Sequence, residues 1–173
     1  MNTAVNTDME ITFVDAWRRD DPELAVAAKA FWERNSLVPA GERERRVSEL
    51  CVLGYVGDEL AALSTAALTI NPQLHARVAM YRCAVAPAFR RHDVSYRISG
   101  HSRFLLEAWS AEHPEEKLMG MAAVIQAAEY RDKQREPIWP EYGLELNLAG
   151  WTDRGEQLRV AWFRHAKLEP YVR

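Results

Sequence analysis

Basic residues gather at a turn between two apolar segments, at Arg90, Arg91 and His92. The segment before the turn, residues 78–85, is rich in β-branched and aromatic side chains and has the length of a β-strand. After the turn apolar residues recur at nearly helical spacing, and Pro87 separates the two segments because it has no N–H to donate. A strand that passes through a basic turn into a helix directs free backbone N–H groups at one point, and such groups bind anions.

Five residues of this region stand at the positions of a known motif: Val85, Pro87, Phe89, Arg90 and Val94. The stretch resembles the acyl-CoA-binding motif of the GNAT N-acyltransferases, which reads roughly V-x-P-x-Y/F-R/Q-x-x-G-x-G/A. Asp93 replaces the first glycine of that motif, and Ser95 replaces its second glycine or alanine. The order of the expected elements is similar to that of the GNAT superfamily over nearly the whole chain.

The resemblance implies that acetyl-CoA or another acyl-CoA binds along this region as a cosubstrate. Backbone N–H groups at the start of the helix would face the pyrophosphate, within a binding region that comprises Arg90, Arg91, His92, Asp93, Val94, Ser95 and Tyr96. A backbone N–H of the preceding strand would polarise the thioester carbonyl, near Cys83, Ala84 and Val85. The pantetheine arm would lie between that strand and a second strand at 117–125.

Asp93 has two interpretations. Close to a pyrophosphate its carboxylate is repulsive, because two unit charges roughly 4 Å apart cost about 4 kcal/mol at an effective dielectric constant of about 20. The neighbouring Arg90, Arg91 and His92 would offset part of this repulsion. Alternatively, Asp93 caps the helix, and its carboxylate accepts hydrogen bonds from the N–H groups that phosphate would otherwise use. In that case CoA must displace the cap, or CoA does not bind.

Three residues are candidates for proton transfer, one as the acid and two as the base. In the GNAT family a tyrosine on the helix after the fifth strand often protonates the leaving thiolate, and the resemblance assigns this role to Tyr130; packing at the sheet edge is the alternative. The base is less evident, because residues 77–85 contain no Asp or Glu. Glu49 could act through a water molecule and His75 lies at a strand edge, but both are also ordinary surface residues.

The residues leave two functions open. The first is an N-acyltransferase that moves the acyl group directly, within a ternary complex, to a primary amine of a small molecule or peptide. The second is a GNAT-like binding or oligomerisation module, for example a homodimer, that has lost catalysis. Asp93 and the missing base favour the second function, whereas the intact half of the motif and Tyr130 favour the first.

Two stretches mark where the acceptor would bind. The family places acceptor contacts near residues 41–46, and the basic cluster in GERERR suits an acidic acceptor. The interleaved glutamates fit a solvated helix face equally. Trp139, beside Tyr142 in a proline-containing loop, could line an acceptor pocket, form a dimer contact or pack in the core.

The elements that must position these residues follow from apolar periodicity. Asp21 and Pro22 mark a helix start, and Gly57-Asp58 marks a hairpin. The expected strands are 10–17, 47–56, 59–70, 77–85, 117–125, 144–149 and 158–168, and the expected helices are 22–34, 41–46, 94–112 and 126–134. Together with the resemblance, this order predicts one GNAT-like α/β (α+β) domain over 1–173, with residues 1–9 flexible. It has a mixed, mostly antiparallel sheet of about seven strands and helices on both faces.

Composition bounds the class of protein and its partners. The 173 residues are 48% hydrophobic and 27% charged, as in soluble globular proteins, and the net charge of −3 argues against a nucleic-acid partner. No apolar run approaches the ~20 residues of a membrane span and no signal peptide is evident, so we expect a cytoplasmic protein without membrane association. Cys51 and Cys83 lie in apolar runs and are expected to be buried thiols on strands. The five histidines show no metal-ligand spacing with them.

Overall fold

The computed structural model describes residues 9–90, 93–126, 130–170 and 172. Its centre is a sheet of eight strands in the order β1-β2-β3-β4-β5-β8-β7-β6. The strands are β1 (Thr12–Asp15), β2 (Leu50–Val56), β3 (Glu59–Asn71), β4 (Ala76–Val85), β5 (Gly120–Ile125), β6 (Ile138–Trp139), β7 (Leu146–Trp151) and β8 (Gln157–Trp162). All neighbouring strands are antiparallel except β4 and β5, which are parallel. The predicted mixed, mostly antiparallel sheet is therefore confirmed, with one strand more than expected.

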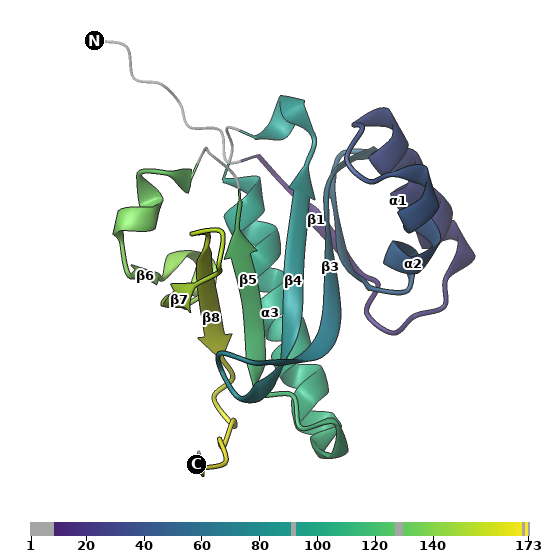
Figure 1. Cartoon of the computed structure of the whole chain (residues 1–173). Helices are drawn as coiled ribbons and strands as arrows, with labels where there is room; N and C mark the ends of the chain where they lie inside the picture. Colours follow the sequence, from purple (N-terminus) through teal and green to yellow (C-terminus); the bar gives the residue numbers. More distant parts are fainter. Residues whose placement is uncertain (1–8, 91–92, 127–129, 171, 173) are drawn as a thin grey trace.

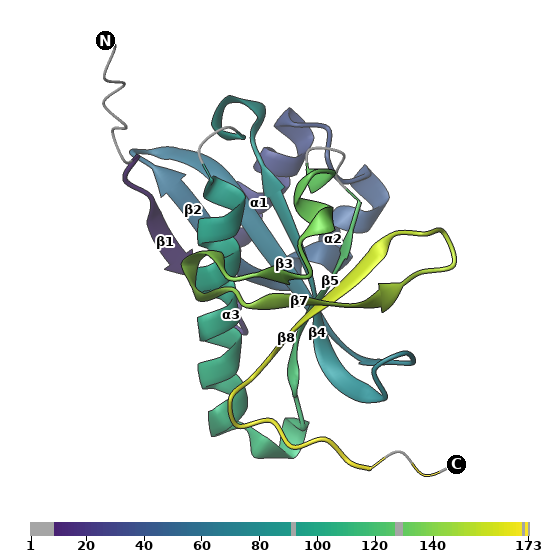
Figure 2. The same cartoon turned by 90° about the vertical axis from the view of Figure 1, so that its left-hand side faces the viewer.

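Helices cover both faces of the sheet, as predicted (Figures 1 and 2). The long helix α3 (Val94–Glu112) lies across one face, where Ile98 and Leu106 are fully buried in the larger apolar cluster. On the other face α1 (Pro22–Arg34) and the short α2 (Arg43–Val47) lie against β2 and β3. Two aromatic residues of α1, Phe31 and Trp32, belong to the apolar cluster of that face.

The predicted start of α1 is confirmed by its cap. The Asp21 carboxylate accepts from the N–H groups of Glu23 and Leu24, at 3.0 and 3.4 Å, and Pro22 occupies the first turn, where a missing N–H costs nothing. The predicted bounds of α1 and α3 agree with the structure. Both helices begin next to strong local signals, which explains why their ends could be predicted.

Long hairpins build the first half of the sheet. Strands β2 and β3 join at Gly57, which has a φ of 59° as the tight turn requires. Strands β3 and β4 pair without a register shift from Ala62 opposite Val85 to Asn71 opposite Ala76. The sequence predicted both hairpins, and it placed the bounds of β3 and β4 within one residue.

The second half of the sheet departs from the expectations. No α-helix forms at 130–134, where a helix over 126–134 was expected; the described residues form turns and the 3₁₀ turn Lys133–Arg135. So short a helix is marginal by itself, and side chains of Trp139 and Arg159 instead bond the carbonyls of Lys133 and Gln134. The strand expected at 158–168 ends at Trp162.

None of the helices in the described part of the chain has both the length and the apolar character needed to cross a bilayer. The two cysteines are free and lie on the strands β2 and β4, as predicted. Cys51 is fully buried as expected, whereas Cys83 is only partly buried.

Candidate active site

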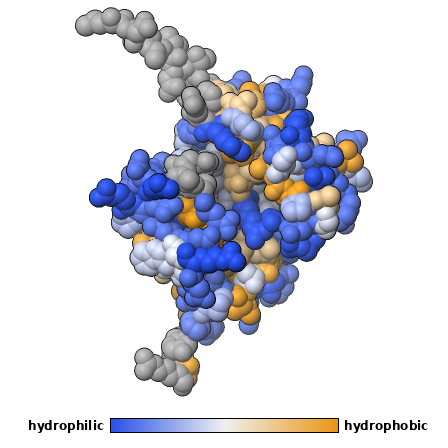
Figure 3. Space-filling model, turned by 45° about the horizontal axis from the view of Figure 1, so that its top comes forward, coloured by the Kyte–Doolittle hydropathy of each residue, from blue (hydrophilic) through white to orange (hydrophobic). Residues whose placement is uncertain are grey.

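The parallel strands β4 and β5 separate at the end of the sheet that the basic turn follows. The two strands pair only from Val78–Gly120 to Met80–Ala122. After Met80 and Ala122 the described residues of the two strands form no further pairs. A cavity of about 600 Å³ lies at this separation. Its walls come from α1 and the following loop, α2, β3, β4, α3, β5 and the loop that carries Tyr130 and Trp139. Figure 3 shows this side of the molecule, with apolar residues along the middle and hydrophilic surface on either side.

The backbone of β4 presents unpaired groups to the cavity. The N–H of Ala86 donates to Ala61 on β3, whereas the carbonyl of Arg77 accepts from Met119 before β5. Because N–H and C=O groups alternate sides along a strand, the odd-numbered residues of β4 direct theirs toward β5. The N–H of Cys83 therefore faces the gap, beyond the last β4–β5 pair. This is the region in which the resemblance predicted the donor to the thioester carbonyl.

The first turn of α3 forms the second side of the site. Asp93 occupies the N-cap position with φ 49° and ψ 14°, the left-handed conformation, and its side chain makes no capping hydrogen bond. The hydroxyl of Tyr142 donates to the Asp93 carboxylate instead. The predicted capping role of Asp93 is therefore wrong. The first-turn N–H groups, those of Val94, Ser95 and Tyr96, are not blocked by that carboxylate.

The left-handed conformation of Asp93 explains why the family motif has a glycine at this position. Glycine adopts positive φ without steric cost, whereas Asp is one of the few other residues that tolerate it. Asp93 thus keeps the backbone path that the motif glycine allows, and adds a negative charge. Arg90 bonds the carbonyl of Val85 through Nε at 3.2 Å, which ties the turn to the end of β4. Arg91 and His92 lie outside the described residues.

Three aromatic rings form one wall of the cavity: Tyr96, Tyr130 and Trp139. Their ring centroids lie 5.7 to 6.1 Å apart. Trp139 is buried with 2% of its surface exposed, so of the three interpretations of this residue, packing and pocket lining agree with the structure. Arg159, itself fully buried, stacks 4.0 Å from the centroid of Trp139 and bonds two carbonyls of the neighbouring loop.

The titratable groups that line the cavity are three tyrosines, one cysteine and two arginines. Burial raises the pKa of Cys83 from 9.0 to about 12, so the thiol is neutral at physiological pH. Burial likewise raises the pKa of Tyr96, with Lys133 acting in the opposite direction. Among the described lining residues there is no carboxylate and no imidazole. Tyr96 lines the α3 side of the cavity and Tyr130 lines its loop side, and further hydroxyl groups come from Thr65, Tyr81, Ser95 and Ser99.

The two candidate bases lie apart from this cavity lining. Glu49 precedes β2 and accepts a hydrogen bond from Arg45 at 3.1 Å, with 17% of its side chain exposed. It approaches the cavity only through its neighbour Arg46, which lines it. His75 lies in the turn between β3 and β4, at the opposite end of β4 from Val85.

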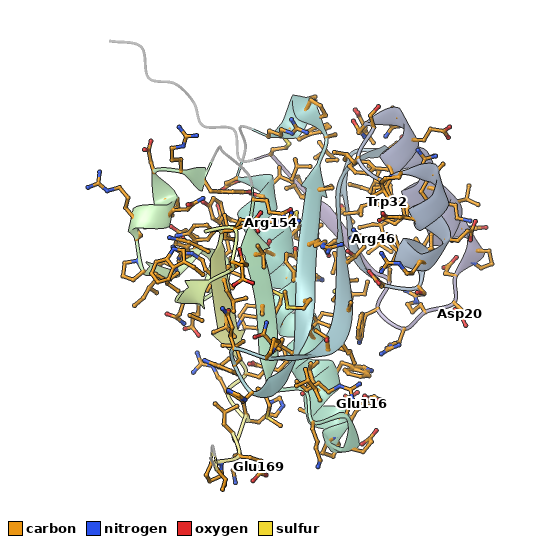
Figure 4. The ribbon with its side chains drawn as sticks, in the orientation of Figure 1. Asp20, Trp32, Arg46, Glu116, Arg154 and Glu169 are labelled. Atoms are coloured by element: carbon orange, nitrogen blue, oxygen red, sulfur yellow. The ribbon has the colours of Figure 1, made fainter. Side chains whose placement is uncertain are left out.

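Two arginines line the cavity on the α2 side. Arg46 of α2 lies between that helix and the sheet, near the labelled Trp32 of α1 (Figure 4). Arg82 comes from β4. The sequence reasoning missed Arg82, although an arginine in the middle of an apolar strand was a usable signal. The other arginines of GERERR do not line the cavity. Arg43 donates a hydrogen bond to the carbonyl of Val38, and Arg45 forms ion pairs with Glu42 and Glu49.

Neither a scan against protein-family models nor a search of curated proteins finds a match. Solved structures do match. An acetyl-CoA complex of NAA60 from Arabidopsis thaliana superposes with a TM-score of 0.58 over 88% of this chain and 99% of that one, at 9% sequence identity. The chain has the GNAT fold. An acetyltransferase of the GNAT family from Streptococcus pneumoniae superposes with a TM-score of 0.55 at 12% identity, over 89% and 99% of the two chains. A third, from Listeria monocytogenes, gives 0.50 at 14% identity, over 89% and 95%.

Two features of the described residues bear on the acyl-CoA site that the resemblance predicts. The free edge of β4 beside the cavity suits a pantetheine arm, whose amides need hydrogen-bond partners. The first turn of α3 suits a pyrophosphate, because its N–H groups are not capped by Asp93. The charge of Asp93 remains the feature that opposes phosphate.

Proposed function

We propose that this chain is an N-acyltransferase that moves an acyl group from acyl-CoA to a primary amine. The observation that carries this proposal is the separation of β4 and β5 beside an uncapped helix N-terminus, with a cavity of about 600 Å³ between them. An acyl-CoA thioester would reach the cavity from the α3 side. The acceptor amine would enter from the side of α1 and α2.

In the proposed reaction the amine nitrogen attacks the thioester carbonyl carbon. The C–N bond forms, the C–S bond breaks, the amine loses a proton and the sulfur gains one. The N–H of Cys83 donates to the carbonyl oxygen, where negative charge develops. Transfer is direct, because a thiol whose pKa is about 12 is a poor nucleophile at neutral pH. Tyr130 supplies the proton to sulfur, and the amine proton leaves through solvent or through Glu49 and a water molecule.

Titration calorimetry with acetyl-CoA and free CoA tests the proposal first. We expect micromolar binding at moderate salt, followed by release of free CoA thiol when amines are added. Absence of binding up to millimolar concentration, for acetyl-CoA and longer acyl-CoAs alike, would contradict the proposed function.

Substitution of Tyr130 tests the acid. We expect Tyr130→Phe to lower kcat by about 100-fold, within the range for removal of a general acid, while the affinity for acetyl-CoA measured by calorimetry changes little. Tyr96→Phe is the matched control, because its ring lies in the same aromatic wall. A larger loss in Tyr96→Phe than in Tyr130→Phe would transfer the role to Tyr96.

The alternative function is a GNAT-like binding or oligomerisation module without catalysis. Two observations favour it: Asp93 at the position of the motif glycine, and the lack of a carboxylate or imidazole among the described cavity residues. Binding of CoA without turnover of any amine would select this alternative.

A further inference from the structure

Two guanidinium groups line the same cavity from different elements. Arg46 comes from α2, and Arg82 comes from β4, the strand next to β3 in the sheet. Their charges act on each other: the pKa of Arg46 is lowered first by burial and next by Arg82. Arg46 is partly buried, whereas Arg82 is exposed at the cavity. Two like charges in such a place are unfavourable unless an anion lies between or beside them.

In the described part of the chain neither arginine forms an ion pair, although the charges of Glu49 and Glu42 act on Arg46 from farther away and raise its pKa. The Nε of Arg46 is buried without a hydrogen-bond partner. The two nearest carboxylates, Glu42 and Glu49, contact Arg45 at 3.7 and 3.1 Å. Because a buried donor without a partner is costly, an unpaired guanidinium in a cavity is a ready site for an incoming acceptor group.

The surroundings of the pair restrict the ligand further. Guanidinium groups match the oxygen geometry of carboxylates and phosphates, to which they donate two parallel hydrogen bonds. Next to the pair the cavity wall is apolar and comprises Trp32, Leu37, Val38 and Leu63. A ligand that fits both parts has an oxyanion at one end and an apolar or small body.

We propose that Arg46 and Arg82 bind an oxyanion of the acceptor, so that the acceptor is a small amine that carries a carboxylate or a phosphate. This inference rests on the proposed acyl transfer for its amine, but the oxyanion site itself does not require turnover. The acceptor amine then points from the arginines toward the N–H of Cys83 and the thioester.

Acetyl transfer to matched amines tests the preference. The pairs are leucine against leucinamide and phosphoethanolamine against ethanolamine, in which the second member lacks the oxyanion; the two pairs separate carboxylate from phosphate. We expect kcat/KM to be at least about tenfold higher for the anionic member of one pair, the lower end for a hydrogen bond to a charged group. Equal rates within both pairs would overturn the inference while the acyl transfer itself stands.

Calorimetric titration of leucine and of phosphoethanolamine, with and without CoA, tests the same site without turnover. We expect Arg46→Gln and Arg82→Gln each to weaken binding of the preferred compound by about 10- to 100-fold. Arg46→Lys keeps the positive charge but cannot donate two parallel hydrogen bonds. Its affinity for the preferred compound should therefore fall less than that of Arg46→Gln. The control is Arg34→Gln, an exposed arginine of α1 outside the cavity lining, which should bind as the wild type does.

The outcomes of the two experiments distinguish the two proposals. Binding of an anionic probe that depends on both arginines supports the oxyanion site even if no acetyl-CoA binds, which would remove only the proposed transfer. A weak substrate has a dissociation constant of roughly 1 mM. If neither leucine nor phosphoethanolamine binds at roughly 100 mM, which is 100 times that value, the oxyanion site is overturned. If Arg34→Gln weakens binding as much as Arg46→Gln does, the oxyanion site is also overturned. The loss of affinity would then follow from the change in net charge of the protein.

Discussion

At the scale of single residues, the charge of Asp93 is the feature most open to test. We expect Asp93→Asn and Asp93→Gly to strengthen CoA binding by about tenfold or more, because both remove a carboxylate next to the predicted phosphate site. Both replacements also tolerate the positive φ of this position. Titration calorimetry at two salt concentrations measures the effect, which should shrink at high salt. Unchanged affinity in both variants would mean that the carboxylate does not act on the phosphates.

The contact between Tyr142 and Asp93 gives the complementary test. In Tyr142→Phe the carboxylate loses the hydroxyl and becomes free to cap α3. CoA binding should then weaken several-fold, and this loss should vanish in the double variant with Asp93→Gly. A loss that persists in the double variant would show that Tyr142 acts on CoA by another route.

The buried thiols give a prediction for the dependence of stability on pH. Burial raises the pKa of both Cys51 and Cys83 from 9.0 to about 12, so the folded state holds protons that the unfolded state releases. Their contribution is therefore complete below about pH 9 and is lost as the pH rises from 9 to 12. Each thiol should lower the free energy of unfolding by about 1.4 kcal/mol per pH unit in that window. Urea denaturation between pH 8 and pH 11 should show a smaller slope for Cys51→Ala than for the wild type.

Local signals predicted the type of residue at the site better than the direction of its side chain. The turn at Arg90 was evident because Pro87 and the change of period stand on either side of it. That Arg46, and not Arg43 or Arg45, faces the cavity follows from the way α2 packs on the sheet, and no property of GERERR alone specifies it. Of the two interpretations of Asp93, the helix cap is wrong because Tyr142, 49 residues later in the chain, takes up the carboxylate.

At the scale of elements, the loop that follows β6 packs closely on α3. A Cβ at Gly100 would lie 2.5 Å from the carbonyl oxygen of Tyr142. Gly-to-Ala inside a helix ordinarily stabilises by up to about 1 kcal/mol. Here we expect Gly100→Ala to destabilise by about 1–3 kcal/mol instead, because backbone must shift. Gly41→Ala is the control, since no atom lies within 4 Å of its Cβ, and thermal unfolding measures both.

Elements with signals at both ends were predictable, and elements shaped by partners were not. Asp21 and Pro22 fix the start of α1 by local hydrogen bonding alone. The segment after β5 has helix-forming residues, yet its described part forms turns, because nearby Trp139 and distant Arg159 bond its carbonyls. The bonds from Arg159 leave no local pattern in the sequence. The two-residue strand β6, which lies between prolines, was also missed.

At the scale of the whole molecule, the sheet has two antiparallel halves, β1 to β4 and β5 to β8, which join at a short parallel seam and share α3. Periodicity predicted the strands, but the seam and the strand order depended on the resemblance. We expect acetyl-CoA to slow amide hydrogen exchange at Cys83, Val85 and the first turn of α3. The slowing should reach about 100-fold at 100 times the dissociation constant, if exchange requires release of the ligand. Amides inside β2, such as that of Leu53, serve as the internal reference. Protection confined to other regions would place the ligand elsewhere.

The separation of β4 from β5 has a consequence for aggregation. An unpaired strand edge is a template for strands of other chains, and sheets are exposed to this hazard mainly at their outer rims. Here the outer strands are short, four residues in β1 and two in β6, and they offer few groups for pairing. The unpaired end of β4 is instead recessed in the middle of the sheet, between the helices of the two faces (Figure 2). A strand of another molecule would have to enter a cavity to pair there, so the fold leaves this edge unpaired without exposing it to strands of other copies.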